Sequence, residues 1–122
     1  MGKIDLKGCT LTQLQDYLKE LGEPAFRAKQ IFKWIYKGYT QFEQMTDLPK
    51  GLVKKLKSSA YISMIDIYKK YESDLDGTVK YVFSLKDKNI VESVKMKYSF
   101  GITACISSQV GCPMGCAFCA ST

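Results

Sequence analysis

Histidine is absent from this 122-residue sequence. Its absence excludes Cys/His zinc sites, Ser-His triads and imidazole bases, so any chemistry must come from thiols, carboxylates, lysines or a cofactor. The sequence also lacks an apolar run near the roughly 20 residues that a membrane-spanning helix needs. Its first residues, MGKIDL, lack the apolar core of a signal peptide. We therefore expect a cytoplasmic protein that does not enter a membrane.

Cysteine, by contrast, is present five times. In a reducing compartment, clustered thiols are metal ligands or catalysts more often than a disulfide framework. Cys112, Cys116 and Cys119 share the segment GCPMGCAFCA, with the spacing Cys-x3-Cys-x2-Cys. Zinc takes four ligands, whereas three thiolates suit a four-iron–four-sulfur cluster whose fourth iron stays open for another molecule. The spacing favours the iron–sulfur cluster, and a zinc site with Cys105 as the fourth ligand is the alternative.

Positive charge is concentrated in the first half of the chain. Residues 1–60 contain eleven Lys or Arg against six Asp or Glu, and residues 61–122 contain seven against six. A compact basic module ahead of a nearly neutral one suggests a surface for a polyanion such as RNA or DNA. A lysine-rich surface that only keeps the protein in solution is the alternative.

The first half also has the apolar periodicity of a small helical bundle. Leu11, Leu14, Leu18 and Leu21 recur at spacings of three and four, which places them on one face of a helix. Three more helices are expected in residues 23–38, in residues 41–45 and in the stretch that Pro49 opens.

Two features of this bundle follow from residue type. Either Thr10 or Thr12 can cap the first helix, because a hydroxyl can accept a hydrogen bond from an unpaired backbone N–H. Phe26, Phe32 and Trp34 are large apolar residues within the second helical segment. We expect these three rings in the core of the bundle rather than in a base-stacking platform.

The second half has the pattern of β-strands. The turn signals DLDG, KDKN and YSFG separate segments in which apolar and polar residues alternate. This arrangement predicts a β-meander, and together the two halves predict an α+β fold. The expected strands occupy residues 64–73, 78–85, 90–97 and 102–110.

Glu92 interrupts the pattern of its strand. By the period of two it shares a face with Ile90, Val94 and Met96. A carboxylate buried among apolar neighbours would have a raised pKa, which suits a general acid or base. The alternative is that Glu92 lies at the rim of the sheet and reaches water.

The cysteine segment and its surroundings resemble a known family. Cys-x3-Cys-x2-Cys with Phe118 before the last cysteine is the cluster motif of radical S-adenosylmethionine enzymes. The longer stretch CISSQVGCPMGCAFCAST is similar to the RlmN family, which methylates C2 of an adenine in 23S rRNA and in tRNA. EPAFRAKQIFKWIYKG, FEQMTDLPK and DGTVKYVFSL resemble the N-terminal part of that family. The Cfr-like relatives, which methylate C8 of the same adenine, are the close alternative.

This resemblance implies cofactors and partners. Cys112, Cys116 and Cys119 would hold a 4Fe-4S cluster, and the open iron would bind S-adenosylmethionine. Phe118 would lie next to the adenine of that cofactor. The implied partners are 23S rRNA, tRNA and an electron donor such as flavodoxin or ferredoxin.

The resemblance also implies two catalytic residues. Cys105 would help to release the methylated base from a covalent link to the enzyme. Glu92 would accept a proton, a role that agrees with its unusual place in the strand pattern. The family's methyl-carrying cysteine, which lies near the C-terminus of a full-length enzyme, has no counterpart here.

The change of pattern near residue 60 and the resemblance together divide the chain into three segments. Residues 1–60 would form a basic, RNA-binding accessory domain like helix-hairpin-helix proteins, and residues 61–101 would form the meander. Residues 102–122 would supply the first strand and the cluster loop of a radical S-adenosylmethionine α/β barrel. We therefore expect an N-terminal fragment that is inactive alone. A standalone basic RNA-binding module with a vestigial cysteine loop is the alternative.

Overall fold

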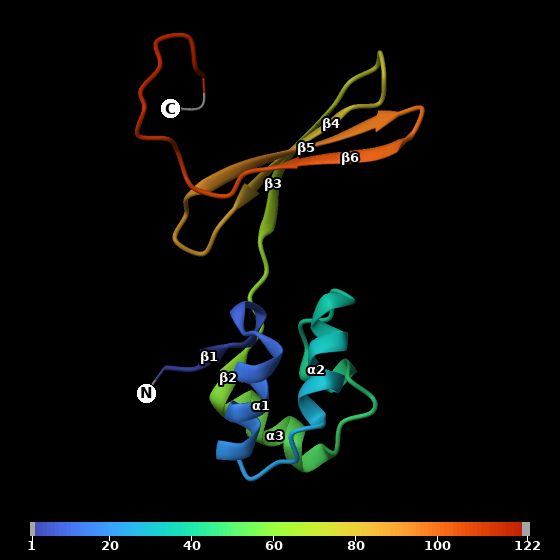
Figure 1. The fold of residues 1–122 in the computed structure, drawn as a ribbon, viewed down its shortest axis with the longest axis vertical. Coiled ribbons are helices and arrows are strands. Elements are labelled where there is room, and N and C mark those ends of the chain that lie inside the picture. Colours follow the sequence, from blue (N-terminus) through green and yellow to red (C-terminus); the bar gives the residue numbers. More distant parts are fainter. Residues whose placement is uncertain (1, 121–122) are drawn as a thin grey trace. The chain divides into compact units, whose positions relative to one another are not determined.

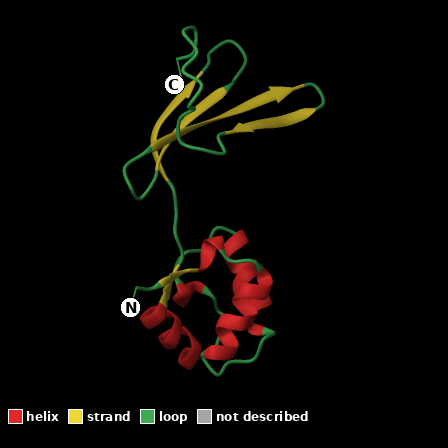
Figure 2. Ribbon diagram, turned by 60° about the vertical axis from the view of Figure 1, so that its left-hand side comes forward, coloured by secondary structure: helices red, strands yellow, loops and turns green. Residues whose placement is uncertain are grey.

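The computed structural model describes residues 2–120. Residues 1, 121 and 122 lie outside the described residues, so the predicted segments 1–60 and 102–122 are described without these end residues. The chain divides into two compact units, one ending at Met64 and the other beginning at Ile65. Helices form most of the first unit and strands form the second (Figures 1 and 2). Among the described residues, no helix has the length and apolarity needed to cross a membrane.

The first helix of the helical unit, α1, begins at a reciprocal cap. It spans Leu11–Glu20, and Thr10 is its N-cap. The Gln13 amide N–H donates to Thr10 Oγ1 over 3.2 Å, and the Thr10 N–H donates to Gln13 Oε1 over 2.8 Å. Both backbone donors would otherwise lack a partner in the first turn. Of the two threonines proposed from the sequence, Thr10 is therefore the cap.

The other predicted helices of this unit are confirmed, with small changes at their ends. Pro49 is the N-cap of the last helix, as its fixed φ favours. The short helix predicted in residues 41–45 is a single turn of 3-10 helix. The elements are η1 (Leu6–Gly8), α2 (Arg27–Tyr36), η2 (Phe42–Gln44) and α3 (Lys50–Ser59).

A short parallel β-pair closes the helical unit, and the sequence pattern did not predict it. β1 (Ile4–Asp5) pairs with β2 (Ala60–Tyr61), which follows directly after α3. The Ser63 N–H adds a bond of 3.0 Å to Asp5 Oδ1. Two residues per strand are too few to give a hydrophobic period, so only the folded structure reveals this contact.

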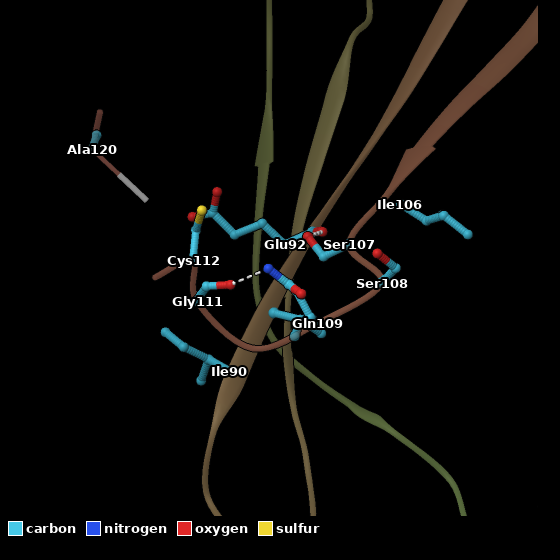
Figure 3. Close-up of a pocket in the computed structure, with 10 residues that line it drawn as sticks. Ile90, Glu92, Ile106, Ser107, Ser108, Gln109, Gly111, Cys112 and Ala120 are labelled. Atoms are coloured by element: carbon cyan, nitrogen blue, oxygen red, sulfur yellow. Dashed lines mark hydrogen bonds between the residues drawn. The ribbon is translucent and has the colours of Figure 1, made fainter. Parts of the chain in front are cut away.

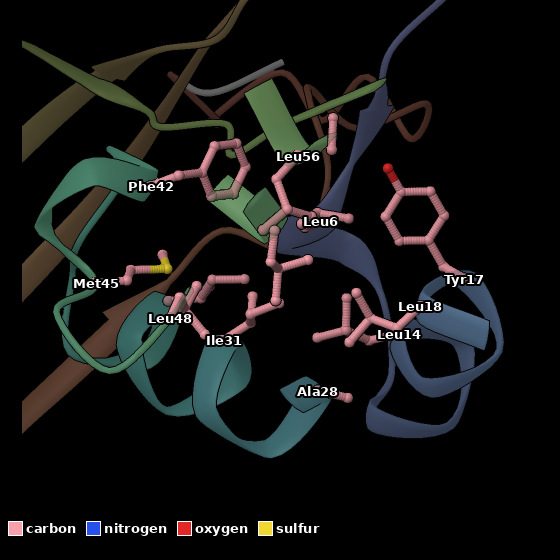
Figure 4. Close-up of a cluster of buried hydrophobic side chains, with 13 residues drawn as sticks. Leu6, Leu14, Tyr17, Leu18, Ala28, Ile31, Phe42, Met45, Leu48 and Leu56 are labelled. Carbon is pink, nitrogen blue, oxygen red and sulfur yellow. The ribbon is translucent and has the colours of Figure 1, made fainter. Parts of the chain in front are cut away.

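The helices pack around one apolar core, shown in Figure 4. The expectation that Phe26 belongs to this core is wrong, because 55% of Phe26 is exposed. Phe32 and Trp34 are partly buried at the edge of the core, and the Trp34 Nε1–H donates to Asp47 Oδ1 over 2.6 Å. The largest fully buried side chains are Leu6, Leu14, Leu18, Ile31, Ile35, Met45, Leu52 and Leu56.

The second unit is a four-stranded antiparallel sheet in the order β3-β4-β5-β6, so the predicted meander is confirmed. Its turns carry the expected chemistry: Asp76 Oδ1 accepts from the Thr78 N–H over 2.9 Å, and Asp87 Oδ1 accepts from the Asn89 N–H over 3.0 Å. The strands are β3 (Asp66–Glu72), β4 (Val79–Ser84), β5 (Ile90–Tyr98) and β6 (Gly101–Ile106).

The last strand is shorter than expected and belongs to the same sheet. β6 ends at Ile106, whereas the sequence pattern extended it to residue 110. It pairs with β5 from Ser93↔Ile106 to Tyr98↔Gly101. In this structure β6 is the fourth strand of the meander. The predicted domain boundary between residues 101 and 102, which would assign this strand to a barrel, stays a prediction.

The reciprocal cap of α1 gives a stability prediction. Thr10→Ala removes the hydroxyl that accepts the Gln13 N–H, so we expect the free energy of unfolding of the helical unit to fall by about 1 kcal/mol. Thr12→Ala is the matched control, because Thr12 is exposed inside the first turn and makes no cap. Urea unfolding followed by circular dichroism measures both variants. Equal losses would show that the cap contributes nothing specific.

Candidate active site

A pocket of about 520 Å³ lies where the sheet meets the cysteine segment (Figure 3). The start of β5, the end of β6 and the loop that follows β6 form its walls. The loop therefore carries the first of the three clustered cysteines to the edge of the sheet. The lining residues are Ile90, Val91, Glu92, Ile106, Ser107, Ser108, Gln109, Gly111, Cys112 and Ala120.

Local hydrogen bonds set the path of this loop. Ser107 Oγ donates to the Glu92 carbonyl over 2.6 Å, which ties the loop to β5 just after the ladder ends. Gln109 Nε2 donates to the Gly111 carbonyl over 3.0 Å, drawn as the dashed line in Figure 3. Gly111 and Gly115 have φ angles of +69° and +60°. Side chains with a Cβ rarely adopt this left-handed backbone, so the tight path depends on glycine at both positions.

The three clustered thiols lie on one exposed stretch of chain. Cys112 and Cys116 are exposed, Cys119 is half-buried, and the Cys119 N–H donates to the Cys116 carbonyl over 3.1 Å. None of them forms a disulfide. Among residues 2–120, no three His, Cys, Asp or Glu side chains are gathered closely enough to hold a metal ion. Three thiols this near in sequence nevertheless fit the donor set that an iron–sulfur cluster needs.

The other two cysteines have different surroundings. Cys9 lies in the helical unit, where its Sγ is 3.4 Å from the Asp5 carbonyl oxygen. Burial raises the pKa of the Cys9 thiol, and the Asp5 charge raises it further. A raised pKa keeps the thiol protonated and unreactive. Cys105, on β6, is exposed, so it is the better candidate for a reactive thiol.

Glu92 is exposed and paired, not buried. Its Oε1 lies 3.0 Å from Lys80 Nζ, and the two side chains are 46% and 43% exposed. Of the two interpretations of the sequence, burial among apolar neighbours is therefore wrong, and a position at the rim is correct. In Figure 3 the Glu92 side chain extends into the pocket toward Cys112.

The strand register places Glu92 and Cys105 on one face of the sheet. Cys105 pairs with Val94, and Val94 is two residues from Glu92 on β5. Residues two apart in a strand share a face, so the carboxylate and the thiol are diagonal neighbours. Ala104 and Ile106 lie on the opposite face.

The structure does not bring all the predicted site residues together. Glu92 and Cys112 line the pocket, but Cys105, Cys116 and Cys119 do not. Phe118 is 94% exposed and also lies outside the pocket. The lining thus combines a carboxylate, two serine hydroxyls, an amide and one thiol, which are polar groups able to bind a polar small molecule.

Two contributors to this site were missed from the sequence. Lys80 holds the Glu92 carboxylate from the neighbouring strand, and Ser107 joins the loop to β5. Lys80 could have been identified from the strand pairing that the KDKN turn sets up. This pairing places Val82 opposite Glu92, and Lys80, two residues from Val82, then lies on the face that carries Glu92. Nothing in the residue pattern marks Ser107.

The chain is similar to known proteins along its whole length. Residues 4–62 match the family model of the ribosomal RNA large subunit methyltransferase N-terminal domain. A protein named probable dual-specificity RNA methyltransferase RlmN, from Alkaliphilus oremlandii (strain OhILAs), is 54% identical over 122 residues, which are 100% of this chain and 36% of that protein. A protein of the same name from Clostridioides difficile (strain 630) is 50% identical over 120 residues, which are 98% of this chain and 35% of that protein.

A solved structure has a similar fold. The crystal structure of a radical SAM methyltransferase from Sphaerobacter thermophilus matches with a TM-score of 0.82 and 36% sequence identity, over 97% of this chain and 35% of that chain. The present chain thus spans about a third of the length of the relatives it matches. In sequence it is similar to an N-terminal part of proteins named RlmN, and in fold it is similar to part of a radical SAM methyltransferase.

Proposed function

We propose that this chain is the N-terminal part of a radical S-adenosylmethionine enzyme that methylates C2 of adenine in 23S rRNA and in tRNA. One observation carries the proposal: a relative named as a dual-specificity RNA methyltransferase aligns with every residue of the chain at 54% identity, the cysteine segment included. The similarity to a radical SAM methyltransferase structure supports the same chemistry. The chain alone, with a third of the relatives' length, is proposed to be inactive.

The three clustered cysteines are proposed to bind a 4Fe-4S cluster. Cys112, Cys116 and Cys119 supply three thiolates, and the left-handed glycines Gly111 and Gly115 let the backbone bend just before the first and just before the second of them. With S-adenosylmethionine, such a cluster supplies radical chemistry when an electron donor such as flavodoxin or ferredoxin reduces it.

The pocket beside this loop is proposed to hold part of the S-adenosylmethionine. The Ser107 and Ser108 hydroxyls and the pocket's apolar wall can accommodate a polar molecule with an aromatic base. Phe118 is proposed to contact the adenine, and its exposed ring on the cysteine loop is available for such a contact. In this structure Phe118 is not among the residues that line the pocket.

Glu92 and Cys105 are proposed as the catalytic residues of this part of the enzyme. Both side chains lie on the same face of the sheet, and Glu92 lines the pocket. Lys80 anchors the Glu92 carboxylate at the pocket rim, where it can accept a proton from a substrate. The exposed Cys105 thiol can act as a nucleophile that breaks a covalent link to the base.

The helical unit is proposed to bind the RNA. Its excess of Lys and Arg gives the electrostatic surface that phosphate groups need. A resemblance to helix-hairpin-helix domains belongs to the same proposal, and the contact between α1 and α2 is compatible with it.

The cysteine assignment predicts which thiols retain iron. After anaerobic reconstitution with iron and sulfide, the chain should bind about four iron and four sulfide ions and show a broad visible absorption band. Cys112→Ser, Cys116→Ser and Cys119→Ser should each lose most of the bound iron. Cys105→Ser and Cys9→Ser are the matched controls and should retain it. Loss of iron in Cys105→Ser, or uptake of colourless zinc by the wild-type chain, would contradict the assignment.

The catalytic assignment is tested in a fusion of this chain with the remaining two-thirds of the Alkaliphilus oremlandii relative. Glu92→Gln removes the proton acceptor, so we expect turnover to fall on the order of 100-fold or more. Cys105→Ala should trap an RNA–protein adduct, visible as a shifted band on a denaturing gel. Lys80→Gln removes the ion-pair partner of Glu92 but keeps the Glu92 carboxylate, so it should lower turnover less than Glu92→Gln does. Wild-type turnover in Cys105→Ala would exclude its proposed role.

A further inference from the structure

One face of α2 carries two lysines and two aromatic rings. Lys29, Phe32, Lys33 and Tyr36 recur at the spacing i, i+3, i+4 and i+7, so they share one side of the helix. Both lysines are exposed, and 63% of Tyr36 is exposed. The adjoining side of α2 supplies the core with its fully buried residues Ala28, Ile31 and Ile35, and Phe32 lies at the border between the two sides.

The two rings form a pair, and a third lysine is positioned beside it. The ring centroids of Phe32 and Tyr36 are 4.5 Å apart. Lys7, from η1, places its Nζ 5.1 Å from the centroid of the Tyr36 ring and 3.4 Å from the Ile35 carbonyl oxygen. This carbonyl helps to hold the ammonium group next to the ring. A cation so placed attracts both the face of an aromatic ring and a nearby phosphate.

The lysines on this face differ in their partners from two of the lysines on α3, Lys55 and Lys57. Lys55 binds the Glu23 carboxylate over 2.7 Å, and Lys57 pairs with Glu43. Their charges are therefore partly neutralised within the protein. In the part of the chain that the structure describes, Lys7, Lys29 and Lys33 form no ion pair with a carboxylate. Their charges remain available to an external anion.

Exposed aromatic rings also occur in the sheet unit, where Tyr98 and Phe100 stack at a centroid distance of 5.1 Å. The relatives continue well beyond the segment that this chain spans, and their additional residues can cover such rings. The helical unit is a different case. It has a closed core of its own, and a family model spans residues 4–62 of it. Exposure on α2 is therefore the stronger indication of a binding surface.

We propose that Lys7, Lys29, Phe32, Lys33 and Tyr36 form a platform on which unpaired bases of the RNA substrate stack. We call this surface the α2 platform. The inference rests on the proposed function, because RNA is the polyanion that it assigns to this enzyme. The three lysines contact the phosphates on either side, and Tyr36 offers its ring to a base. Every base has an aromatic face, so the platform binds unpaired RNA with little preference for sequence.

The platform predicts a preference for unpaired bases. In a double helix the base faces are covered by their neighbours, so duplex RNA can use only the lysines. The probes are a fluorescein-labelled oligoadenylate, an abasic strand of equal length and charge, and a duplex RNA. We expect the wild-type chain to bind oligoadenylate on the order of tenfold more tightly than the abasic strand. Fluorescence anisotropy at several salt concentrations measures all three affinities.

Variants separate the ring from the charge. Tyr36→Leu keeps an apolar side chain without the ring, so it should bind oligoadenylate and the abasic strand about equally. Tyr36→Phe keeps the ring and should bind like wild type. The double variant Lys29→Gln/Lys33→Gln should weaken binding to every probe. For single-stranded RNA, the slope of log affinity against log salt concentration should become shallower by roughly 0.7 for each phosphate contact that is lost. The matched control is Lys55→Gln/Lys57→Gln, which removes paired lysines and should have the smaller effect. Circular dichroism verifies that each variant is folded.

The outcomes distinguish the platform from the proposed function. If Tyr36→Leu binds oligoadenylate as tightly as wild type while binding stays salt-dependent, the platform is wrong and RNA binding by the helical unit stands. The same conclusion follows if the abasic strand binds as well as oligoadenylate. If the wild-type chain binds none of the probes at low salt, RNA binding by the helical unit itself fails. A tenfold preference that Tyr36→Leu abolishes and Tyr36→Phe retains supports the platform.

Discussion

The register between β5 and β6 determines where Glu92, Cys105 and the start of the cysteine loop lie in the candidate site. Pairing of Val94 with Cys105 puts the thiol on the face that carries Glu92, and it brings Ser107 opposite Glu92 where the loop begins. Because side chains alternate along a strand, a slip of one residue would move Cys105 to the other face. The same slip would move Ser107 away from the Glu92 carbonyl to which it now donates. Backbone pairing thus sets the position of the carboxylate, the thiol and the loop together.

Much of this arrangement follows from short-range rules in the sequence. The helices could be predicted because leucines at spacings of three and four define a buried face, and because Thr10 and Pro49 mark helix starts. The strands could be predicted because turns such as DLDG and KDKN separate alternating segments, and the hairpins then fix which residues pair. The cysteine spacing suggested a set of thiolate donors without any knowledge of the fold, and that assignment stays a prediction. Each of these signals involves residues within a few positions of one another.

The features that could not be predicted depend on residues far apart in the chain. Apolar neighbours on its strand suggested that Glu92 is buried, but a sheet face is buried only if something packs on it, and Lys80 reaches the carboxylate instead. Phe26 was assigned to the core from its residue type, yet its position at the entry to α2 turns it outward, where it meets the Arg27 guanidinium. Pairing of residues 4–5 with residues 60–61 leaves no periodic trace at all.

That small parallel pair has a consequence for how such proteins are assembled. Since β1 and β2 lie side by side, the helical unit begins and ends at the same place, and its core is complete between those two points. A unit whose ends meet can be attached to another protein, or moved within a gene, through a single junction without opening its core. The pairing of Ile4 and Asp5 with the residues after α3 therefore makes the helical unit a self-contained module that can keep its basic surface when it is joined to another domain.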